Sequence, residues 1–129
     1  MTPLRDRQLT FARTLALFLA WLVEHGYDVT VGDAWRSTDE LLCCHCGTPV
    51  TYQDLLVSNG RSKVRASAHT ERRAIDLNLF VDGTLASPAQ YRPLGERWEQ
   101  LGGRWGGRFG VDPKDYAEKI GWDSGHFEL

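Results

Sequence analysis

The spacing of apolar residues near the start of the chain predicts a long amphipathic helix. Apolar side chains recur at the spacing of one helix face at Phe11, Leu15, Phe18 and Leu22. Gly26 follows this stretch. Glycine readily adopts the left-handed conformation that ends helices. We therefore expect a helix over residues 3–25, with its apolar face packed against the core.

Alternation of apolar and polar residues predicts strands further along the chain. The clearest stretch covers residues 73–81, where Ile75, Leu77 and Leu79 share one face and Asp76 lies on the other. Shorter alternating stretches predict strands at 27–31 and 126–129, and the pattern over 93–101 predicts a second helix.

Residues 37–60 interrupt these patterns and are predicted to form an irregular insertion, with a short helix at 52–57. All three cysteines lie here, at Cys43, Cys44 and Cys46. Adjacent cysteines pair poorly and no distant cysteine exists, which favours a reducing compartment. Cys43 and Cys46 have the spacing of half a structural zinc site. The cluster supplies at most three of the four ligands of a closed site, so free cysteines are favoured over a second zinc.

The length and net charge of the chain limit the classes of function that it can have. The 129 residues suit one domain, and 15 basic against 17 acidic residues give a formal net charge of −2. This balance argues against a dedicated binder of nucleic acid or of membrane surfaces. Residues 61–73 hold five basic residues and one acidic residue, and a solvated loop is favoured over a wall-binding surface there.

The apolar run over residues 15–23 is too short to span a bilayer. No cleavage site of small residues follows it, so no signal peptide is expected. We therefore expect a protein that is made in the cytoplasm.

Two histidines and an aspartate lie where strand ends can bring them together. His69 precedes the strand at 73–81, Asp76 lies on its polar face, and His126 opens the last strand. A catalytic zinc site uses three such ligands and keeps one position open. Taken singly, each residue is more typical of a salt bridge or of the surface, but jointly they predict one metal site. Asp123 is expected beside it, and Glu128 shares a face with His126 and is expected to orient that ring.

Four motifs extend this pattern. Residues 67–76 read SAHTERRAID, and residues 123–128 read DSGHFE. Residues 105–109 read WGGRF, and residues 33–37 read DAWRS. In order and spacing these segments resemble the zinc peptidases of the D-Ala-D-Ala carboxypeptidase and L-Ala-D-Glu endopeptidase family, in the branch that contains phage endolysins. One departure is Arg72, which stands where the family has glycine, so the loop before Asp76 must keep a negative φ or accept strain.

The resemblance implies a single-domain α+β fold of the Hedgehog/DD-peptidase type, with a small antiparallel sheet packed against helices. It also implies one catalytic Zn²⁺ on His69, Asp76 and His126. Asp123 becomes the general base, where related dipeptidases use glutamate. Arg36 becomes a group that binds substrate or stabilises the oxyanion, and Ser67 shapes the site around the substrate.

The implied activity is hydrolysis of a peptide bond in peptidoglycan stem peptides, of the L-Ala-D-Glu endopeptidase or D-Ala-D-Ala carboxypeptidase type. The expected protein is a monomeric phage or prophage lysis enzyme, cytoplasmic until it is released to the cell wall, or a virion-borne enzyme. One alternative is an inactive wall-binding module of the same fold, although no ligand or base is lost. A nucleic-acid-binding protein that uses the basic and glycine-rich segments is the weaker alternative.

Overall fold

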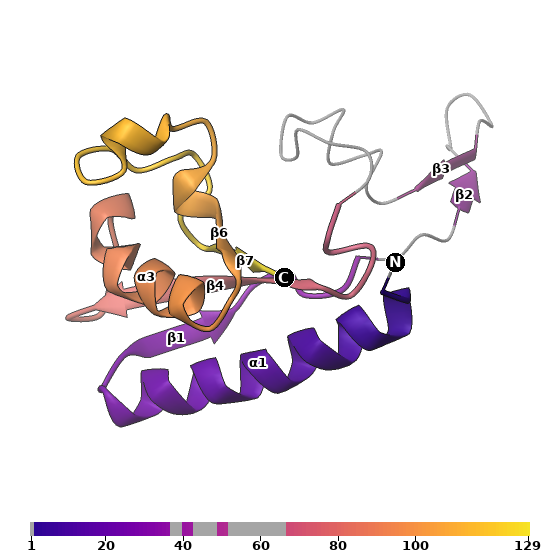
Figure 1. Cartoon of the computed structure of the whole chain (residues 1–129), viewed down its shortest axis with the longest axis horizontal. Helices are drawn as coiled ribbons and strands as arrows, with labels where there is room; N and C mark the ends of the chain where they lie inside the picture. Colours follow the sequence, from indigo (N-terminus) through magenta and orange to yellow (C-terminus); the bar gives the residue numbers. More distant parts are fainter. Residues whose placement is uncertain (1, 37–39, 43–48, 52–66) are drawn as a thin grey trace.

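The computed structural model describes residues 2–36, 40–42, 49–51 and 67–129. Its first element, α1 (Leu4–Glu24), has the predicted extent to within one residue at each end. The helix buries the face that carries Phe11, Phe18 and Leu22. Gly26, with φ of +74°, follows its end and reverses the chain into the sheet. Figure 1 shows α1 lying along the strands.

The main sheet is antiparallel throughout, with the strand order β1-β4-β7-β6 and with β5 paired to β4. Its members are β1 (Asp28–Val31), β4 (Ala74–Val81), β5 (Thr84–Leu85), β6 (Arg104–Trp105) and β7 (His126–Glu128). The long central strand β4 pairs with β1 along one edge. Along its other edge it pairs with the short strands β7 and β5, one at each end. The final strand of the chain inserts between β4 and β6, which places the C-terminal residues in the middle of the sheet.

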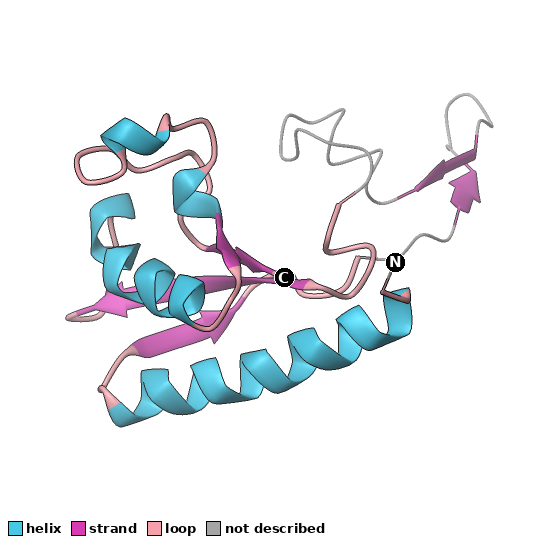
Figure 2. Ribbon diagram, in the orientation of Figure 1, coloured by secondary structure: helices cyan, strands magenta, loops and turns pink. Residues whose placement is uncertain are grey.

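A second helix packs beside α1 on the apolar face of the sheet. The chain from β5 to β7 forms η1 (Pro88–Tyr91), α3 (Arg92–Gln100), η2 (Gly106–Arg108) and η3 (Pro113–Asp115). Phe18 of α1, Trp98 of α3 and Phe127 of β7 meet with ring centroids 5.1 to 6.1 Å apart. All three side chains are fully buried. This aromatic centre lies on the face of the sheet that packs against α1 and α3, so the other face of β4 and β7 is left for polar groups. Figure 2 shows the two helices beside the strands.

The predicted α+β class, a small antiparallel sheet packed against helices in a single domain, is confirmed. The insertion is less irregular than expected, because β2 (Glu40–Leu42) and β3 (Pro49–Thr51) pair antiparallel within residues 37–60. The β-branched Val50 and Thr51 favour this extended backbone. The helix expected at 52–57 and the cysteines Cys43 and Cys46 lie outside the described residues. In the described parts of the chain, no helix is long and apolar enough to cross a membrane.

Candidate metal centre

The register between β4 and β7 brings two of the expected ligands together. Asp76 lies directly opposite His126, and Ile75 lies opposite Phe127. Since side chains alternate along a strand, this pairing directs Asp76 and His126 to the polar face, while Ile75 and Phe127 enter the core. Glu128 follows His126 by two residues and therefore shares its face. Directly opposed residues also bring their side chains close, so the register itself builds half of the site.

A tight turn before β4 supplies the third residue. The Ser67 Oγ accepts a hydrogen bond from the backbone N–H of His69 at 3.1 Å, and the Thr70 hydroxyl donates to the Ser67 carbonyl at 2.7 Å. The Arg36 N–H donates to the His69 carbonyl at 3.2 Å, which ties the turn to the segment that follows β1. These bonds hold a His69 ring that is almost completely buried. Ser67 thus positions His69 in this structure.

Arg72 closes the same turn in the left-handed conformation, with φ of +60°. The turn therefore accepts strain of about 1–2 kcal/mol, the usual cost of this conformation for a residue with a Cβ. Its backbone N–H donates to the His69 carbonyl at 3.3 Å. Its guanidinium lies over the Trp35 ring, 4.5 Å from the centroid, and this cation–π contact favours the arrangement.

The three expected ligand atoms form a nearly equilateral triangle. His69 Nε2, His126 Nδ1 and Asp76 Oδ1 lie 3.1 Å from one another. The two rings are buried and the carboxylate is partly buried. A tetrahedral zinc ion with bonds of about 2.0–2.1 Å separates its ligand atoms by about 3.3 Å, so the triangle matches one face of such a site. These three residues can hold a metal ion.

In each histidine ring, the nitrogen that points away from the triangle donates a hydrogen bond to a partner of its own. In a neutral ring, the nitrogen at the triangle is therefore the one that accepts. His69 Nδ1 lies 2.8 Å from the Ala34 carbonyl, and since a carbonyl only accepts, this nitrogen carries the proton. His126 Nε2 lies 2.8 Å from Glu128 Oε1 and donates in the same way. In their neutral forms both rings thus direct a lone pair at Asp76 Oδ1. Three acceptors at 3.1 Å repel one another unless a cation lies among them.

The second oxygen of Asp76 faces the buried Arg36, whose Nη2 lies 3.5 Å from Asp76 Oδ2. Arg36 Nε in turn donates to Asp33 Oδ2 at 3.0 Å. Asp33 also fixes the backbone, because its carbonyl accepts from the Asp76 N–H at 2.7 Å. Burial disfavours the Asp76 carboxylate, but its hydrogen bonds with His126 and His69 outweigh burial and lower the pKa of Asp76 to about 2. The ligand is therefore ionised at every physiological pH.

His126 lies between two carboxylates. Burial disfavours its charged form, yet the hydrogen bonds to Asp76 and Glu128 outweigh burial and raise the pKa of His126 to about 9. In the metal-free protein at neutral pH, His126 Nδ1 is therefore protonated and donates a hydrogen bond to Asp76 Oδ1, so a proton lies where a metal ion belongs. The pKa of Glu128 is lowered by its hydrogen bond from His126, so this partner stays ionised.

Metal binding is expected to release about one proton at pH 7–8, because His126 Nδ1 must lose its proton before it can coordinate. The raised pKa of His126 sets the direction in which zinc affinity changes with pH. Apparent zinc affinity should rise about tenfold per pH unit up to pH 9 and level off above it. Calorimetric titration with zinc in buffers of different ionisation enthalpy measures the proton count directly. A count near zero at pH 7 contradicts the protonated His126.

Asp123 lies at the open side of the triangle, in the turn that leads into β7. Its Oδ2 is 3.8 Å from His126 Nδ1, and its side chain is 48% exposed. Gly106 packs against this turn, where a Cβ would lie 2.0 Å from the Asp123 carbonyl oxygen. Burial, reinforced by the Asp76 carboxylate and offset in part by His126, raises the pKa of Asp123. A carboxylate there is half open to solvent and more basic than usual.

The structure thus brings six of the expected residues to one place: His69, Asp76, His126, Asp123, Arg36 and Glu128. Sequence reasoning missed the Ala34 carbonyl and the double role of Asp33. It also missed Phe109, whose ring packs 5.5 Å from that of His126. A backbone carbonyl carries no signal in the sequence. Phe109, by contrast, is marked by its place in the WGGRF segment.

Comparison with known proteins reveals a structural likeness. No protein-family model matches the chain, and no curated protein matches it. The crystal structure of the L-Ala D-Glu endopeptidase ChiX from Serratia marcescens is similar, with a TM-score of 0.59 and 19% sequence identity. The match covers 92% of this chain and 77% of that protein. The likeness is one of fold.

Proposed function

We propose that the chain is a zinc-dependent peptidase that cleaves a bond in peptidoglycan stem peptides. The observation that carries this proposal is the triangle of His69 Nε2, His126 Nδ1 and Asp76 Oδ1, whose 3.1 Å edges and converging lone pairs fit zinc. The fold that the chain shares with an L-Ala D-Glu endopeptidase supports the substrate class. The donor set alone would fit other zinc hydrolases.

When bound, zinc supplies a Lewis acid that polarises the scissile carbonyl and makes water more acidic. Asp123 lies on the open side of the triangle, where substrate and water enter. Its Oδ2 takes a proton from the attacking water and delivers it to the leaving amine. Its side chain is 48% exposed and its Oδ2 lies 3.8 Å from His126 Nδ1, so it can reach both solvent and the metal centre.

The remaining residues hold this arrangement. Glu128 fixes the tautomer and tilt of the His126 ring through a 2.8 Å hydrogen bond. Arg36 is engaged by Asp33 and Asp76, so we assign it first to the orientation of Asp76. Its expected contact with a substrate carboxylate or an oxyanion stays a prediction. Ser67 supports the turn of His69, and its expected part in shaping the substrate site also stays a prediction.

An enzyme accounts for the site better than the two alternatives. An inactive wall-binding module needs no converging lone pairs and no carboxylate at the open position. For a nucleic-acid-binding protein, arginines of the basic and glycine-rich segments already pair with carboxylates of the chain, because Arg73 pairs with Glu71 and Arg108 with Glu99. The phage lysis role, the monomeric state and the release from the cytoplasm rest on sequence motifs and stay predictions.

Digestion of purified peptidoglycan tests the proposed function. Zinc-loaded protein is expected to create new peptide termini, which mass spectrometry identifies, and chelator-treated protein is not. New amino-terminal D-Glu indicates the endopeptidase type, and free D-Ala indicates the carboxypeptidase type. If the zinc-loaded protein releases neither product from walls of several chemotypes, the proposal is wrong.

A further inference from the structure

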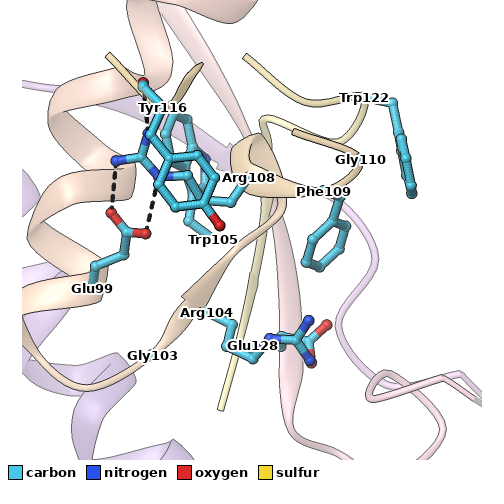
Figure 3. Close-up of a pocket in the computed structure, with 10 residues that line it drawn as sticks. All are labelled: Glu99, Gly103, Arg104, Trp105, Arg108, Phe109, Gly110, Tyr116, Trp122 and Glu128. Carbon is cyan, nitrogen blue, oxygen red and sulfur yellow. Dashed lines mark hydrogen bonds and ion pairs between the residues drawn. The ribbon is translucent and has the colours of Figure 1, made fainter. Parts of the chain in front are cut away.

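A groove with a volume of about 560 Å³ adjoins the metal centre, and apart from Glu128 its lining has no part in the chemistry described above. Figure 3 shows Phe109 in this groove, with Trp122 on one side and the Arg108–Glu99 pair on the other. The groove and the metal centre share a wall. Glu128 lines the groove and also bonds His126, and Phe109 packs on the His126 ring. A ligand in the groove therefore lies next to the reacting bond.

Aromatic rings form much of the groove surface, and one of them is held in an exposed position. Trp122 is 61% exposed, an unusual state for the largest apolar side chain. Its ring packs beside Phe109, with centroids 6.1 Å apart. It also lies against Gly110, where a Cβ would come within 2.2 Å of the ring. The backbone at Gly110 thus makes room for Trp122 and keeps its ring at the groove.

The charges of the groove cancel. Arg108 donates two hydrogen bonds to Glu99, at 3.0 and 3.1 Å, and lies between the rings of Trp105 and Tyr116. Arg104 lies 3.5 Å from Glu128. Two arginines and two glutamates leave the lining without net charge, so the groove selects neither anions nor cations. It offers aromatic faces together with hydrogen-bonding groups.

We propose that this groove binds an N-acetylated amino sugar of the glycan strand next to the stem peptide that is cleaved. The C–H face of a sugar ring packs on an aromatic ring, and its hydroxyl and acetamido groups find the polar rim. Both kinds of partner are present here, and the sugar is neutral, like the groove. This inference rests on the proposed function for the identity of the substrate.

The position of the groove also favours one bond. A stem peptide leaves the glycan through its first residue, and an extended chain spans about 3.3–3.6 Å per residue. With a sugar beside Glu128, the metal centre reaches a bond close to the glycan. The D-Ala-D-Ala bond lies at the far end of the stem. The groove therefore favours the L-Ala-D-Glu bond.

Titration with the tetramer of N-acetylglucosamine tests the sugar site without any peptide. Calorimetry should detect binding by wild type, both with zinc and in the presence of chelator. Trp122→Ala should weaken that binding about tenfold, and Trp122→Phe should restore part of it. Leu17→Ala is the matched control, since Leu17 is as exposed as Trp122, at 62%, but lies outside the groove, and it should bind as wild type does.

Two substrates separate this proposal from the peptidase proposal. Trp122→Ala should lower kcat/KM on stem peptide attached to a disaccharide and leave the glycan-free peptide unaffected. Equal cleavage of both substrates by both proteins, with no binding of the tetramer, overturns the sugar site. If the tetramer binds in a Trp122-dependent way but wild type cleaves neither substrate, the sugar site stands and the peptidase proposal fails.

Discussion

Replacing His69 by alanine is expected to abolish zinc binding at this site and, with it, peptidase activity. The ring supplies one corner of the 3.1 Å triangle, and two ligands cannot hold zinc as three do. Loss of a residue that only supports a ligand typically costs about 10- to 100-fold in metal affinity. We expect loss of a ligand itself to cost more, and cleavage to fall below detection.

The measurement must separate lost metal from lost folding, because His69 is buried and its removal leaves a cavity. Zinc at a thousand times its Kd should stabilise wild type by about 4 kcal/mol. The zinc-dependent rise in Tm, rather than Tm itself, is therefore the readout. His25→Ala is the matched control, since this exposed ring at the end of α1 packs on Trp21 and should leave the rise unchanged.

A His69→Ala protein that keeps the full zinc-dependent rise in Tm contradicts the assignment of the ligands. If the rise then disappears on replacing Cys43 and Cys46 by serine, the metal belongs to the cysteine cluster. One zinc per chain in wild type, and none in His69→Ala, is the expected stoichiometry.

The alternation of apolar and polar residues over 73–81 and 126–129 made the polar face of the site predictable. The pattern over 73–81 placed Asp76 on the face opposite to Leu77, and His126 and Glu128 followed by the same rule. The register did not follow from alternation. A slip of two residues keeps every side chain on its face but moves Asp76 away from His126. That pairing is fixed by tertiary contacts, including the bond from the Leu77 N–H to the Gly125 carbonyl at 2.8 Å.

The surroundings of the ligands were the least predictable part of the site. Any residue at position 34 offers a carbonyl to His69, so the sequence contains no trace of this contact. Arg36 was expected to face the substrate, because an arginine near a metal site suits carboxylates. Only the path of the chain after β1 shows that its guanidinium reaches Asp76 and Asp33. Arg72 stands where the family that the sequence resembles has glycine, and its positive φ shows how the turn accommodates a side chain there.

Replacing Asp123 by asparagine is expected to lower kcat about 10²- to 10⁴-fold, the usual contribution of a general base. The amide keeps the shape of the side chain but cannot accept the proton. Zinc affinity should stay close to that of wild type, because Asp123 Oδ2 lies 3.8 Å from His126 Nδ1 and outside the triangle of ligand atoms. Rates of stem-peptide cleavage, together with zinc titration of the same samples, measure both effects.

The pH profile distinguishes a base from a residue that merely shapes the turn. With zinc held at saturation at every pH, so that deprotonation of His126 does not limit the rate, activity of wild type should rise with pH as the Asp123 carboxylic acid loses its proton, since only the carboxylate accepts one. This acidic limb should vanish in Asp123→Asn and return in Asp123→Glu, which restores a carboxylate on a longer side chain. A structural role predicts a lower rate with the acidic limb intact in Asp123→Asn. That result, or a loss of zinc binding parallel to the loss of rate, would remove Asp123 from the proton transfer.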